Sequence, residues 1–457
     1  MKELTLKQIA DWCGGTVAPE YETVPVTGVE SDSRKVEVGD LFVALRGERV
    51  DGHDFIPSAK TLGAAAALVS RPSEELPCVV VESPLRAYGE IAKHYREMTG
   101  VKVVGITGSV GKTTTKEMIA SVLSRDFKLY KSEGNHNNDI GLPMTVMNMP
   151  EDTELLVAEL GTNHPGEIAY LSAIAQPDYA VITNIGIAHI EYLGSREGIL
   201  REKLDILRSS LKNTVGIFNG DEPLLWNVRD KGTHKKYYFG IDNPSCDVVA
   251  SGIQELDDGM RFHVSGFHHE FELFVPALGR HMVYNALAAA TVGLAMGVKP
   301  ETIQNELSIF RNTGMRQKIY EKNGMTIIED CYNAGPESTE AALGVLASVK
   351  TSGKRIAVLG DMLELGNRSS AEHYRIGRIA AQKADLLLTY GAHSVRTVTG
   401  AITGGMSPKN AEHFDTHEDL VRMLKMRAGE SDVILFKGSR GMKMERVLQM
   451  FLDDHEA

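Results

Sequence analysis

VVGITGSVGKTTTKE, residues 103–117, runs from an apolar segment through three glycines to a lysine and three threonines. The apolar residues 101–106 predict a buried strand and residues 113–124 predict a helix, so the glycines lie on the turn between them. At such a turn, unpaired backbone N–H groups and the positive end of the helix dipole favour an anion. Glycine lets the backbone approach a phosphate closely, Lys112 would reach the β and γ phosphates, and Thr113 would ligate Mg²⁺.

This turn predicts a site for the phosphates of a nucleoside triphosphate. The usual pattern has a glycine five residues before Gly111, where this chain has Ile106 between Gly105 and Gly108. The alternative is a tight glycine turn that only caps a helix, but the order of strand, Gly-Lys-Thr turn and helix favours the phosphate site. The residues expected to line it are Thr107, Gly108, Ser109, Val110, Gly111, Lys112, Thr113 and Thr114.

Length and composition indicate a soluble protein of several domains. A chain of 457 residues is too long for one hydrophobic core, which predicts three domains. Its 42% hydrophobic and 24% charged residues match ordinary globular usage. The net charge of −12 and the pI of about 5.7 disfavour nonspecific binding to nucleic acid or anionic membranes, so phosphate binding must be local.

The cysteines and the N-terminus indicate where the protein works. The four cysteines are far apart and form no CxxC pair, which predicts reduced thiols without a disulfide or a structural zinc. The N-terminal residues lack the apolar core of a signal peptide, and no stretch approaches the roughly 18 apolar residues of a membrane span. We therefore expect a cytoplasmic protein without membrane insertion. Separately, we expect a monomer.

Hydrophobic patterning divides the chain into three α/β domains: 1–98, 99–312 and 313–457. Residues 1–98 predict a small mixed α/β domain, with strands at 40–47 and 77–82 and a helix at 55–69. In 99–312, apolar runs at 101–107, 154–160 and 178–184 alternate with helical stretches, as in a parallel sheet covered on both faces, and residues 260–279 predict an appended hairpin. In 313–457, strands at 325–330, 355–361, 385–390 and 432–438 alternate with helices such as 369–384, which predicts a Rossmann-like domain.

Polar residues at the ends of neighbouring strands are candidates for holding a metal and a second substrate. Glu159 ends one apolar run, and Asn184 and His189 follow another. Open α/β sheets bind ligands at the carboxyl ends of their strands, where a Glu and a His can hold a magnesium ion between nucleotide and acceptor. The alternative is a surface Glu and a hydrogen-bonded loop His.

Lys203 interrupts the apolar face of a predicted helix over residues 196–211. Leu200, Leu204, Leu207 and Leu211 follow helical spacing, and Lys203 projects from the middle of their arc. Burial lowers the pKa of a lysine, and the neutral amine can react with CO₂ to form a carbamate suited to Mg²⁺. The alternative is a lysine that extends past the leucines to water. The charged residues expected on the opposite, solvent-facing side are Arg201, Glu202, Asp205, Arg208 and Lys212.

The chain resembles the ATP-dependent Mur ligases of peptidoglycan synthesis over essentially its whole length. The resemblance is carried by the phosphate turn and by DSRKVEVGDLFVALRGERVDGHDFI, EGNHNNDIGLP, AELGTNHPGEI, TNIGIAHIEYLGS, DCYNAGPEST, LGDMLELG and VILFKGSRGMKME. It implies a UDP-substrate domain, a central ATP-binding domain and a C-terminal domain that binds the incoming dipeptide. LGDMLELG and the KGSRGM stretch match the member that joins D-alanyl-D-alanine to UDP-N-acetylmuramoyl-tripeptide most specifically.

The resemblance also implies roles for particular residues. ATP phosphates would lie on 107–113, with magnesium on Thr113, Glu159, His189 and a carbamoylated Lys203; Lys112, Glu159, His189 and Lys203 would be catalytic. His281 and Asn285 would contact the nucleoside, and Arg316 and Asp330 would close over the nucleotide. Without the resemblance, Asn285 would be interpreted as a helix residue that bonds to its own turn. Substrate-binding residues would be Ser31, Asp32, Ser33, Arg34, Asn135, Asn137, Asn138, Lys437, Ser439 and Arg440.

The expected reaction is an amide ligation through an acyl phosphate, giving the UDP-muramoyl-pentapeptide, ADP and phosphate. Transfer of the γ-phosphoryl group activates the peptide carboxylate, and the free amine of the dipeptide then attacks the acyl carbon and expels phosphate. Three alternatives remain: another Mur ligase, a ligase like folylpolyglutamate synthase, and a P-loop switch that hydrolyses ATP without joining anything. LGDMLELG and KGSRGM argue against the first two, and Lys203 with Glu159 and His189 argues against the third.

Overall fold

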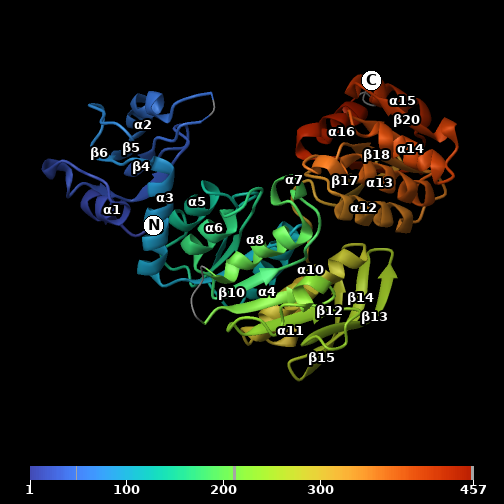
Figure 1. Ribbon diagram of the computed structural model, residues 1–457, viewed down its shortest axis with the longest axis horizontal. Coiled ribbons are helices and arrows are strands. Elements are labelled where there is room, and N and C mark those ends of the chain that lie inside the picture. The colour runs from blue at the N-terminus through green and yellow to red at the C-terminus, as the bar shows by residue number, and fades with distance from the viewer. Residues whose placement is uncertain (48, 209–212, 454–457) are drawn as a thin grey trace.

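Three α/β units follow one another along the chain in the computed structural model (Figure 1), which describes residues 1–47, 49–208 and 213–453. The first contains a four-stranded parallel sheet in the order β3-β4-β5-β6 and a two-stranded antiparallel sheet of β1 and β2. Its elements are β1 Leu4–Thr5, α1 Leu6–Cys13, β2 Pro25–Val26, β3 Gly28–Glu30, β4 Asp40–Val43, α2 Ile56–Leu62, β5 Ala66–Val69, β6 Cys78–Val80 and α3 Pro84–Thr99.

The helix predicted over residues 55–69 is wrong in its second half. α2 ends at Leu62, because Gly63 adopts φ +104 and closes the last turn with its N–H on Ala59 and Lys60. The alanine-rich segment that follows is β5, which pairs with β4 on one side and β6 on the other. Its four residues are all fully buried, so packing inside a parallel sheet overrides the helix propensity of alanine.

The second unit is built on a nine-stranded sheet in the order β15-β14-β13-β12-β11-β10-β7-β9-β8. The strands from β8 to β13 are parallel, and β13, β14 and β15 form an antiparallel extension that includes the predicted hairpin. The strands are β7 Lys102–Thr107, β8 Leu129–Lys131, β9 Leu155–Glu159, β10 Tyr179–Ile182, β11 Val215–Asn219, β12 Lys236–Gly240, β13 Val248–Leu256, β14 Gly259–Gly266 and β15 His269–Val275.

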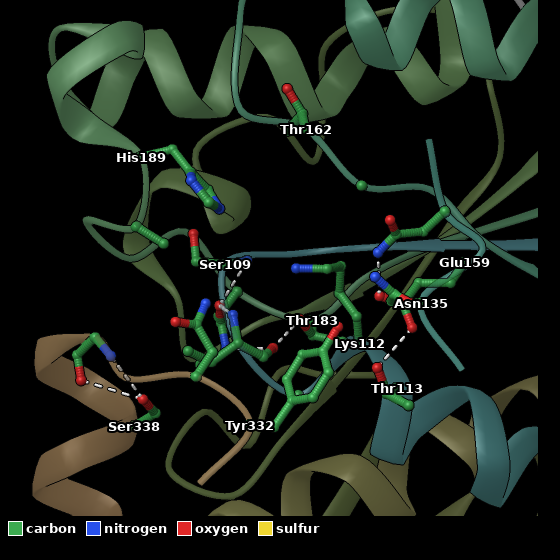
Figure 2. A pocket seen from close by; sticks show the side chains of 18 of the residues that line it. Ser109, Lys112, Thr113, Asn135, Glu159, Thr162, Thr183, His189, Tyr332 and Ser338 are labelled. Atoms are coloured by element: carbon green, nitrogen blue, oxygen red, sulfur yellow. Dashed lines mark hydrogen bonds between the residues drawn. The ribbon is translucent and has the colours of Figure 1, made fainter. Parts of the chain in front are cut away.

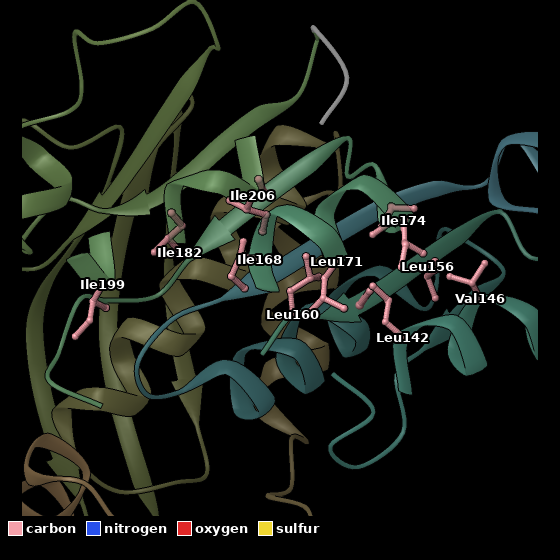
Figure 3. Packing of buried hydrophobic residues seen from close by; sticks show 14 of the residues in the cluster. Leu142, Val146, Leu156, Leu160, Ile168, Leu171, Ile174, Ile182, Ile199 and Ile206 are labelled. Atoms are coloured by element: carbon pink, nitrogen blue, oxygen red, sulfur yellow. The ribbon is translucent and has the colours of Figure 1, made fainter. Parts of the chain in front are cut away.

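Helices cover both faces of this sheet, as expected for its apolar parallel strands. Along β9, Leu156 and Ala158 face one core, while Leu155 and Val157 face another that α4 and α10 cover. Figure 3 shows the first of these cores, where α5, α6 and α8 pack on the sheet. The helices are α4 Lys112–Leu123, α5 Gly141–Met147, α6 Glu167–Ala175, α7 Ile190–Leu193, α8 Arg196–Arg208, α9 Pro223–Trp226, α10 Arg280–Ala295 and α11 Pro300–Ser308.

The third unit has a six-stranded sheet in the order β16-β17-β21-β18-β19-β20. It is parallel except for the hairpin of β16 and β17. In the described residues, no helix is long and apolar enough to cross a membrane. The elements are β16 Lys318–Lys322, β17 Met325–Asp330, α12 Pro336–Ser348, β18 Arg355–Gly360, α13 Ser369–Lys383, β19 Leu386–Tyr390, α14 Val395–Thr403, β20 Ala411–Phe414, α15 His417–Arg427, β21 Val433–Lys437 and α16 Met444–Asp453.

Helix α3 is shared by the first and second units. It packs against α1 and also against α5 and α6. Arg96, which is buried, donates to the carbonyl oxygens of Ala175 (3.1 Å) and Gln176 (2.9 Å) at the C-terminal end of α6. The hydroxyl of Tyr95 accepts from the N–H of Lys2 (2.8 Å). One helix therefore joins the two units through polar and apolar contacts.

We expect Arg96→Met to lower the free energy of unfolding by about 1–3 kcal/mol, because two carbonyl groups lose a charged donor in a buried place. Denaturant titration followed by the fluorescence of Trp12 and Trp226 would measure the loss. The matched control is Arg422→Met, which removes an exposed pair with Asp419 and should change the free energy by less than about 0.5 kcal/mol. Equal effects of the two substitutions would contradict the prediction.

Candidate active site

A cavity of about 1010 Å³ lies between the second and third units, at the carboxyl ends of β7, β9 and β10 (Figure 2). One wall carries the phosphate turn and the ends of the neighbouring strands. The other is made by the third unit, with residues from β17, α12 and the loops after β18 and β21. Pockets for one ligand usually measure about 300–1,000 Å³, so this cavity lies at the upper limit of that range.

Residues at the end of β10 shape the phosphate turn. The side-chain oxygen of Asn184 accepts from the N–H groups of Ser109 (3.1 Å) and Val110 (3.0 Å), and the hydroxyl of Thr183 donates to the carbonyl of Val110 (2.6 Å). Two N–H groups expected to be free for phosphate are thus used within the protein. The first turn of α4 still offers its N–H groups, since a helix start has no preceding turn to bond to. Asn184 was singled out as following a strand, but its role in shaping the turn was missed.

Six of the eight residues predicted for the phosphate turn line the cavity, from Ser109 to Thr114. Thr107 is buried in β7, and Gly108 lies beneath the turn at φ +154, where a Cβ would come within 1.9 Å of the Thr183 hydroxyl. The Nζ of Lys112 donates to the carbonyl of Gly108 (2.9 Å), which folds the lysine over the turn. Burial lowers the pKa of Lys112, partly offset by the charge of Glu159.

Glu159 lies beside the phosphate turn because β9 pairs with β7, with Ile106 opposite Glu159. Its carboxylate accepts from the hydroxyl of Thr113 (2.7 Å) and from the side-chain amide of Asn137 (2.8 Å), and it is only 2% exposed. Asn135 and Asn138 line the same cavity, and Asn138 also accepts from the N–H of Gly141, at the start of α5. The structure thus brings together a hydroxyl, a carboxylate and the asparagine loop predicted to lie near a substrate carboxylate.

His189 lies on the opposite side of the phosphate turn, and Figure 2 shows its ring turned into the cavity above Ser109. Its Nδ1 pairs with the carboxylate of Glu364 from the third unit. This contact lowers the pKa of Glu364, chiefly through the hydrogen bond to His189. No sequence pattern predicts a role for Glu364, because its partner is 175 residues away.

Lys203 is 2% exposed and does not reach water, so the alternative of a solvated lysine is wrong. Its pKa lies well below the usual range, first because of burial and then because of the nearby charge of Lys112. It is not among the residues that line the cavity, although the charge of Lys112, which does line it, acts on Lys203. The site therefore holds a buried amine, biased toward its neutral form, close to the phosphate turn.

The neighbouring Glu202 corrects the predicted orientation of helix α8. It was expected to face solvent, but it is buried and accepts from the N–H groups of Gly166 (2.7 Å) and Ile168 (2.8 Å). These N–H groups belong to the loop and first turn of α6, and they stabilise a carboxylate that would be too costly to bury alone. The buried face of α8 is therefore rotated about the helix axis relative to the face predicted from the leucines. Of the residues in that prediction, Leu211 and Lys212 lie outside the described residues.

The residues predicted to contact the nucleoside lie at the start of α10. Asn285 accepts from the hydroxyl of Thr115, and a Cβ on Gly111 would meet its oxygen at 2.7 Å, so it packs directly on the phosphate turn. His281 pairs through Nε2 with the side chain of Gln317 (2.8 Å), and burial lowers its pKa. Both residues line the cavity.

Residues of the third unit complete this end of the cavity. The guanidinium of Arg316 lies 3.9 Å from the ring centre of Tyr332. Asp330, at the end of β17, accepts from the Nζ of Lys437 (2.6 Å), which also donates to the carbonyl of Asn333 (2.9 Å). Lys437 was predicted to bind a substrate carboxylate, but here its charge is paired with Asp330. Within the described structure, its contacts indicate that it positions the loop after β17.

The prediction that KGSR opens a helix is wrong in detail. The segment leads into a single 3₁₀ turn, Arg440–Met442, and α16 begins only at Met444. The hydroxyl of Ser439 donates to the carbonyl of Ala334 (3.0 Å) and accepts from the N–H of Leu363 (2.9 Å), so it joins two loops. Arg440 lines the cavity and pairs with Glu445 (3.0 Å), which leaves its guanidinium partly available.

Ser31, Asp32, Ser33 and Arg34 lie in the loop after β3 and do not line the cavity. The guanidinium of Arg34 forms two hydrogen bonds with the carboxylate of Asp32, at 2.8 and 2.7 Å. This pair lowers the pKa of Asp32 to about 2. The segment is a polar turn in the first unit, separate from the phosphate turn.

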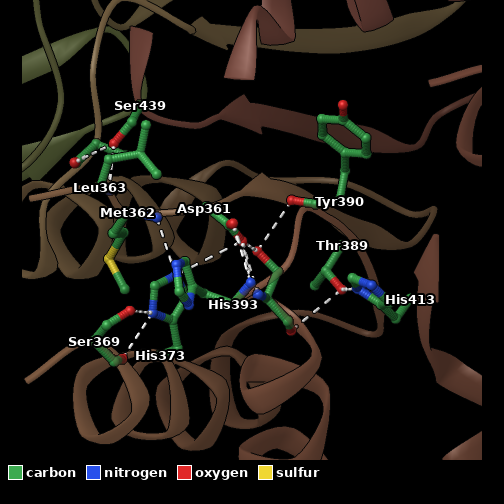
Figure 4. Close-up of polar contacts among 12 residues, drawn as sticks. Asp361, Met362, Leu363, Ser369, His373, Thr389, Tyr390, His393, His413 and Ser439 are labelled. Carbon is green, nitrogen blue, oxygen red and sulfur yellow. Dashed lines mark hydrogen bonds and ion pairs between the residues drawn. The ribbon is translucent and has the colours of Figure 1, made fainter. Parts of the chain in front are cut away.

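The loop that carries Glu364 is fixed within the third unit by a buried polar network (Figure 4). Asp361 is 3% exposed and accepts from the N–H groups of His393 (3.1 Å) and Ser394 (2.7 Å). His373 accepts from the N–H of Met362 (3.0 Å) through Nε2 and bonds the carbonyl of Ser369 (2.8 Å) through Nδ1. Both contacts suit the neutral imidazole.

We expect this network to weaken as the pH falls below the usual histidine pKa of about 6.5. Burial lowers the pKa of His373, with a smaller lowering from His393 and opposing effects from Ser369, Asp361 and Glu372. The unfolded chain therefore binds a proton that the folded chain does not, so the free energy of unfolding falls with falling pH. Denaturant titrations from pH 7.5 to 5.5 should show a shallower slope for His373→Gln than for the unsubstituted protein; equal slopes would contradict this.

Comparison with known proteins covers all three units. Three family models match in succession: "Mur ligase family, catalytic domain" over residues 25–108, "Mur ligase middle domain" over 106–293, and "Mur ligase, glutamate ligase domain" over 315–440. The UDP-N-acetylmuramoyl-tripeptide--D-alanyl-D-alanine ligase of Bacillus subtilis is 41% identical over 99% of both chains, and that of Escherichia coli is 35% identical over 98% of both.

Solved structures give the same result. A crystal structure of MurF from Acinetobacter baumannii has a TM-score of 0.90 and 32% identity over 99% of both chains. A structure of MurF ligase from Thermotoga maritima in complex with ADP has a TM-score of 0.83 and 31% identity over 94% of this chain and 98% of that one. Together with the phosphate turn that faces the third unit, these matches over all three units identify the class as a three-domain P-loop ligase. The chain belongs to the Mur ligase family.

Proposed function

We propose that this protein is an ATP-dependent ligase that joins D-alanyl-D-alanine to UDP-N-acetylmuramoyl-tripeptide through an acyl phosphate. The observation that carries the proposal is the similarity, over essentially the whole of both chains, to relatives named for this reaction. The product would be the UDP-muramoyl-pentapeptide precursor of peptidoglycan, with release of ADP and phosphate. A cytoplasmic, monomeric enzyme is proposed with it.

The domain roles follow from this proposal. Residues 1–98 would bind the UDP-substrate, 99–312 would bind ATP, and 313–457 would bring the dipeptide. The UDP end of the substrate would then be contacted by Ser31, Asp32, Ser33 and Arg34. These residues lie away from the phosphate turn, as expected if one long substrate extends from the first unit to the ATP site. Arg440 is a better candidate than Lys437 for the dipeptide carboxylate, because Lys437 is already paired with Asp330 while Arg440 borders the cavity.

The phosphate turn supports the first chemical step. The N–H groups at the start of α4 and the Nζ of Lys112 would stabilise negative charge on the γ-phosphoryl group as it moves to the peptide carboxylate. Asn135 and Asn137 would hold that carboxylate beside Glu159. His281 and Asn285 would contact the nucleoside, and Arg316 and Asp330 would cover the nucleotide from the third unit. Positioning of three ligands in one cavity then accounts for much of the rate.

The donor set fits magnesium carried by the nucleotide. The described residues contain no group of three or more His, Cys, Asp and Glu side chains that could hold a metal by themselves. Mg²⁺ usually takes one or two carboxylates together with substrate phosphates, and the hydroxyl of Thr113 beside Glu159 provides such a partial set, with His189 across the turn. When bound, the metal would neutralise charge on the phosphates. A carbamate on Lys203 would add a second carboxylate.

Phosphate release tests the proposal against its alternatives. In the presence of ATP and Mg²⁺, release should require both UDP-N-acetylmuramoyl-tripeptide and D-alanyl-D-alanine, and mass spectrometry should identify the pentapeptide product. Release with neither substrate would favour a P-loop switch. Release with glutamate or a diamino acid in place of the dipeptide would favour another ligase of the same fold.

A further inference from the structure

The turn Gly186–Glu191 lies between the phosphate turn and the third unit. From one side, the N–H of Gly186 donates to the hydroxyl of Ser109 (2.9 Å). From the other, the N–H of Ile187 donates to the carboxylate of Glu337 (2.9 Å), at the start of α12. One short segment thus contacts both walls of the cavity.

Glu364 contacts the same turn in a different way. Its carboxylate pairs with Nδ1 of His189, and its carbonyl accepts from the N–H of Glu191 (3.4 Å). Glu337 is bonded only to backbone in this turn, whereas Glu364 is bonded to the imidazole itself. The third unit therefore supplies two carboxylates to one turn, and only one of them acts on a side chain that faces the cavity.

The backbone on both sides of the His189–Glu364 contact is held in an uncommon conformation. His189 has φ +60 and Glu364 has φ +61, a region that non-glycine residues rarely adopt. Such conformations cost of order 1 kcal/mol and persist where the surroundings hold them. For Glu364, those surroundings are the buried network around Asp361 and the bond from Leu363 to Ser439. Its position is therefore fixed to the third unit.

The contact also determines which ring nitrogen of His189 faces the cavity. A carboxylate accepts a hydrogen bond, so in the neutral ring Nδ1 carries the proton and Nε2 keeps its lone pair. No described residue forms a hydrogen bond with Nε2, and His189 lines the cavity beside the phosphate turn. A lone pair directed there suits a cation better than a phosphate oxygen, which would need a donor.

We propose that Glu364 is a positioning residue, supplied by the third unit, that orients His189 so that Nε2 faces the metal carried by the nucleotide. The central unit then has its full set of donors only when the third unit is docked on it. Carboxylates that bond the second nitrogen of a ligating histidine commonly raise metal affinity by fixing the ring. The inference rests on the proposed function for its metal and nucleotide, and goes beyond it in assigning this role to Glu364.

The test is Mn²⁺ binding to the full-length protein in the presence of ADP, followed by electron paramagnetic resonance of the free ion. Glu364→Ala should weaken Mn²⁺ binding about tenfold or more, as loss of such a partner does elsewhere. Glu364→Gln should weaken it by roughly threefold or less, because the amide oxygen accepts the same hydrogen bond. Glu337→Ala is the matched control, since it removes a contact with the same turn without touching His189, and it should leave Mn²⁺ affinity within about twofold of the unsubstituted value.

Three outcomes would overturn the proposal: unchanged Mn²⁺ affinity in Glu364→Ala, an equal loss in Glu337→Ala, or no Mn²⁺ uptake by the unsubstituted ADP complex. Equal losses of Mn²⁺ affinity in Glu364→Ala and Glu337→Ala would mean that docking of the third unit in general, and not the orientation of His189, determines the affinity for the metal. Thermal unfolding of each variant identifies any that fails to fold; if Glu364→Ala does, Glu364→Leu replaces it, because it also removes the acceptor for His189 and should weaken Mn²⁺ binding about as much. The proposed function is judged separately by substrate-dependent phosphate release, so either can fail alone.

Discussion

Lys112→Ala should lower kcat for substrate-dependent phosphate release by about 10²- to 10³-fold, the loss that follows removal of one preorganised donor from a developing charge. Lys112 is the cationic side chain of the phosphate turn, and its Nζ already lies over the turn on the carbonyl of Gly108. Its low-dielectric surroundings strengthen its attraction for a moving phosphoryl group. Initial rates with saturating ATP, UDP-substrate and dipeptide would measure the loss.

The matched control for this prediction is Lys102→Ala. Lys102 is the exposed first residue of the same strand, β7, and lies at the end away from the cavity. It should keep kcat within about twofold, as expected for a surface substitution away from a site. If Lys112→Ala kept more than roughly a tenth of the activity, the assigned role of the turn in stabilising charge would be wrong.

Lys203→Ala should lose activity by about 10²-fold or more, because a carbamate at this position would supply a metal-binding carboxylate close to Lys112 of the phosphate turn. The structure favours the required chemistry, since burial biases the amine toward its neutral, nucleophilic form. Removing CO₂ from the unsubstituted enzyme should lower its activity, and bicarbonate should restore it. The readout is phosphate release, together with a carbamate carbon signal after addition of ¹³C-bicarbonate.

The control distinguishes carbamate formation from a structural role. Lys203→Ala should gain nothing from bicarbonate and should show no carbamate signal. Lys203→Arg keeps a long basic side chain but cannot form the carbamate, so it should be as inactive as the alanine variant. Full activity of Lys203→Ala, or of CO₂-depleted unsubstituted enzyme, would remove the carbamate from the mechanism.

The parts of the site that the sequence predicted depend on local patterns. The phosphate turn could be predicted because glycine, lysine and threonine stand between an apolar strand and a helix. All of its residues are adjacent in the sequence, so no long-range contact is needed to bring them together. Glu159 could be placed at a strand end because parallel strands present their carboxyl ends at one edge. Its contact with Thr113 then needs only that β9 pairs with β7.

The missed features depend on partners that are distant in sequence. Glu202 reads as solvent-facing on a helical wheel, and only the N–H groups of Gly166 and Ile168 explain its burial. The pairing of His189 with Glu364 requires a particular docking of two units, which no spacing in either segment encodes. The alanines of β5 predict a helix because alanine favours helices, whereas here neighbouring strands pair with the segment on both edges.

The sharing of helix α3 has a mechanical consequence. Helix α3 packs on both the first and second units, and Arg96 forms hydrogen bonds across their boundary. These contacts oppose rotation of the first unit relative to the second. We therefore expect motion between units to occur mainly at the connection before the third unit. Such motion would change the distance between the proposed dipeptide site and the phosphate turn, while the distance from the first unit to the phosphate turn would stay constant and would fit substrates of one length.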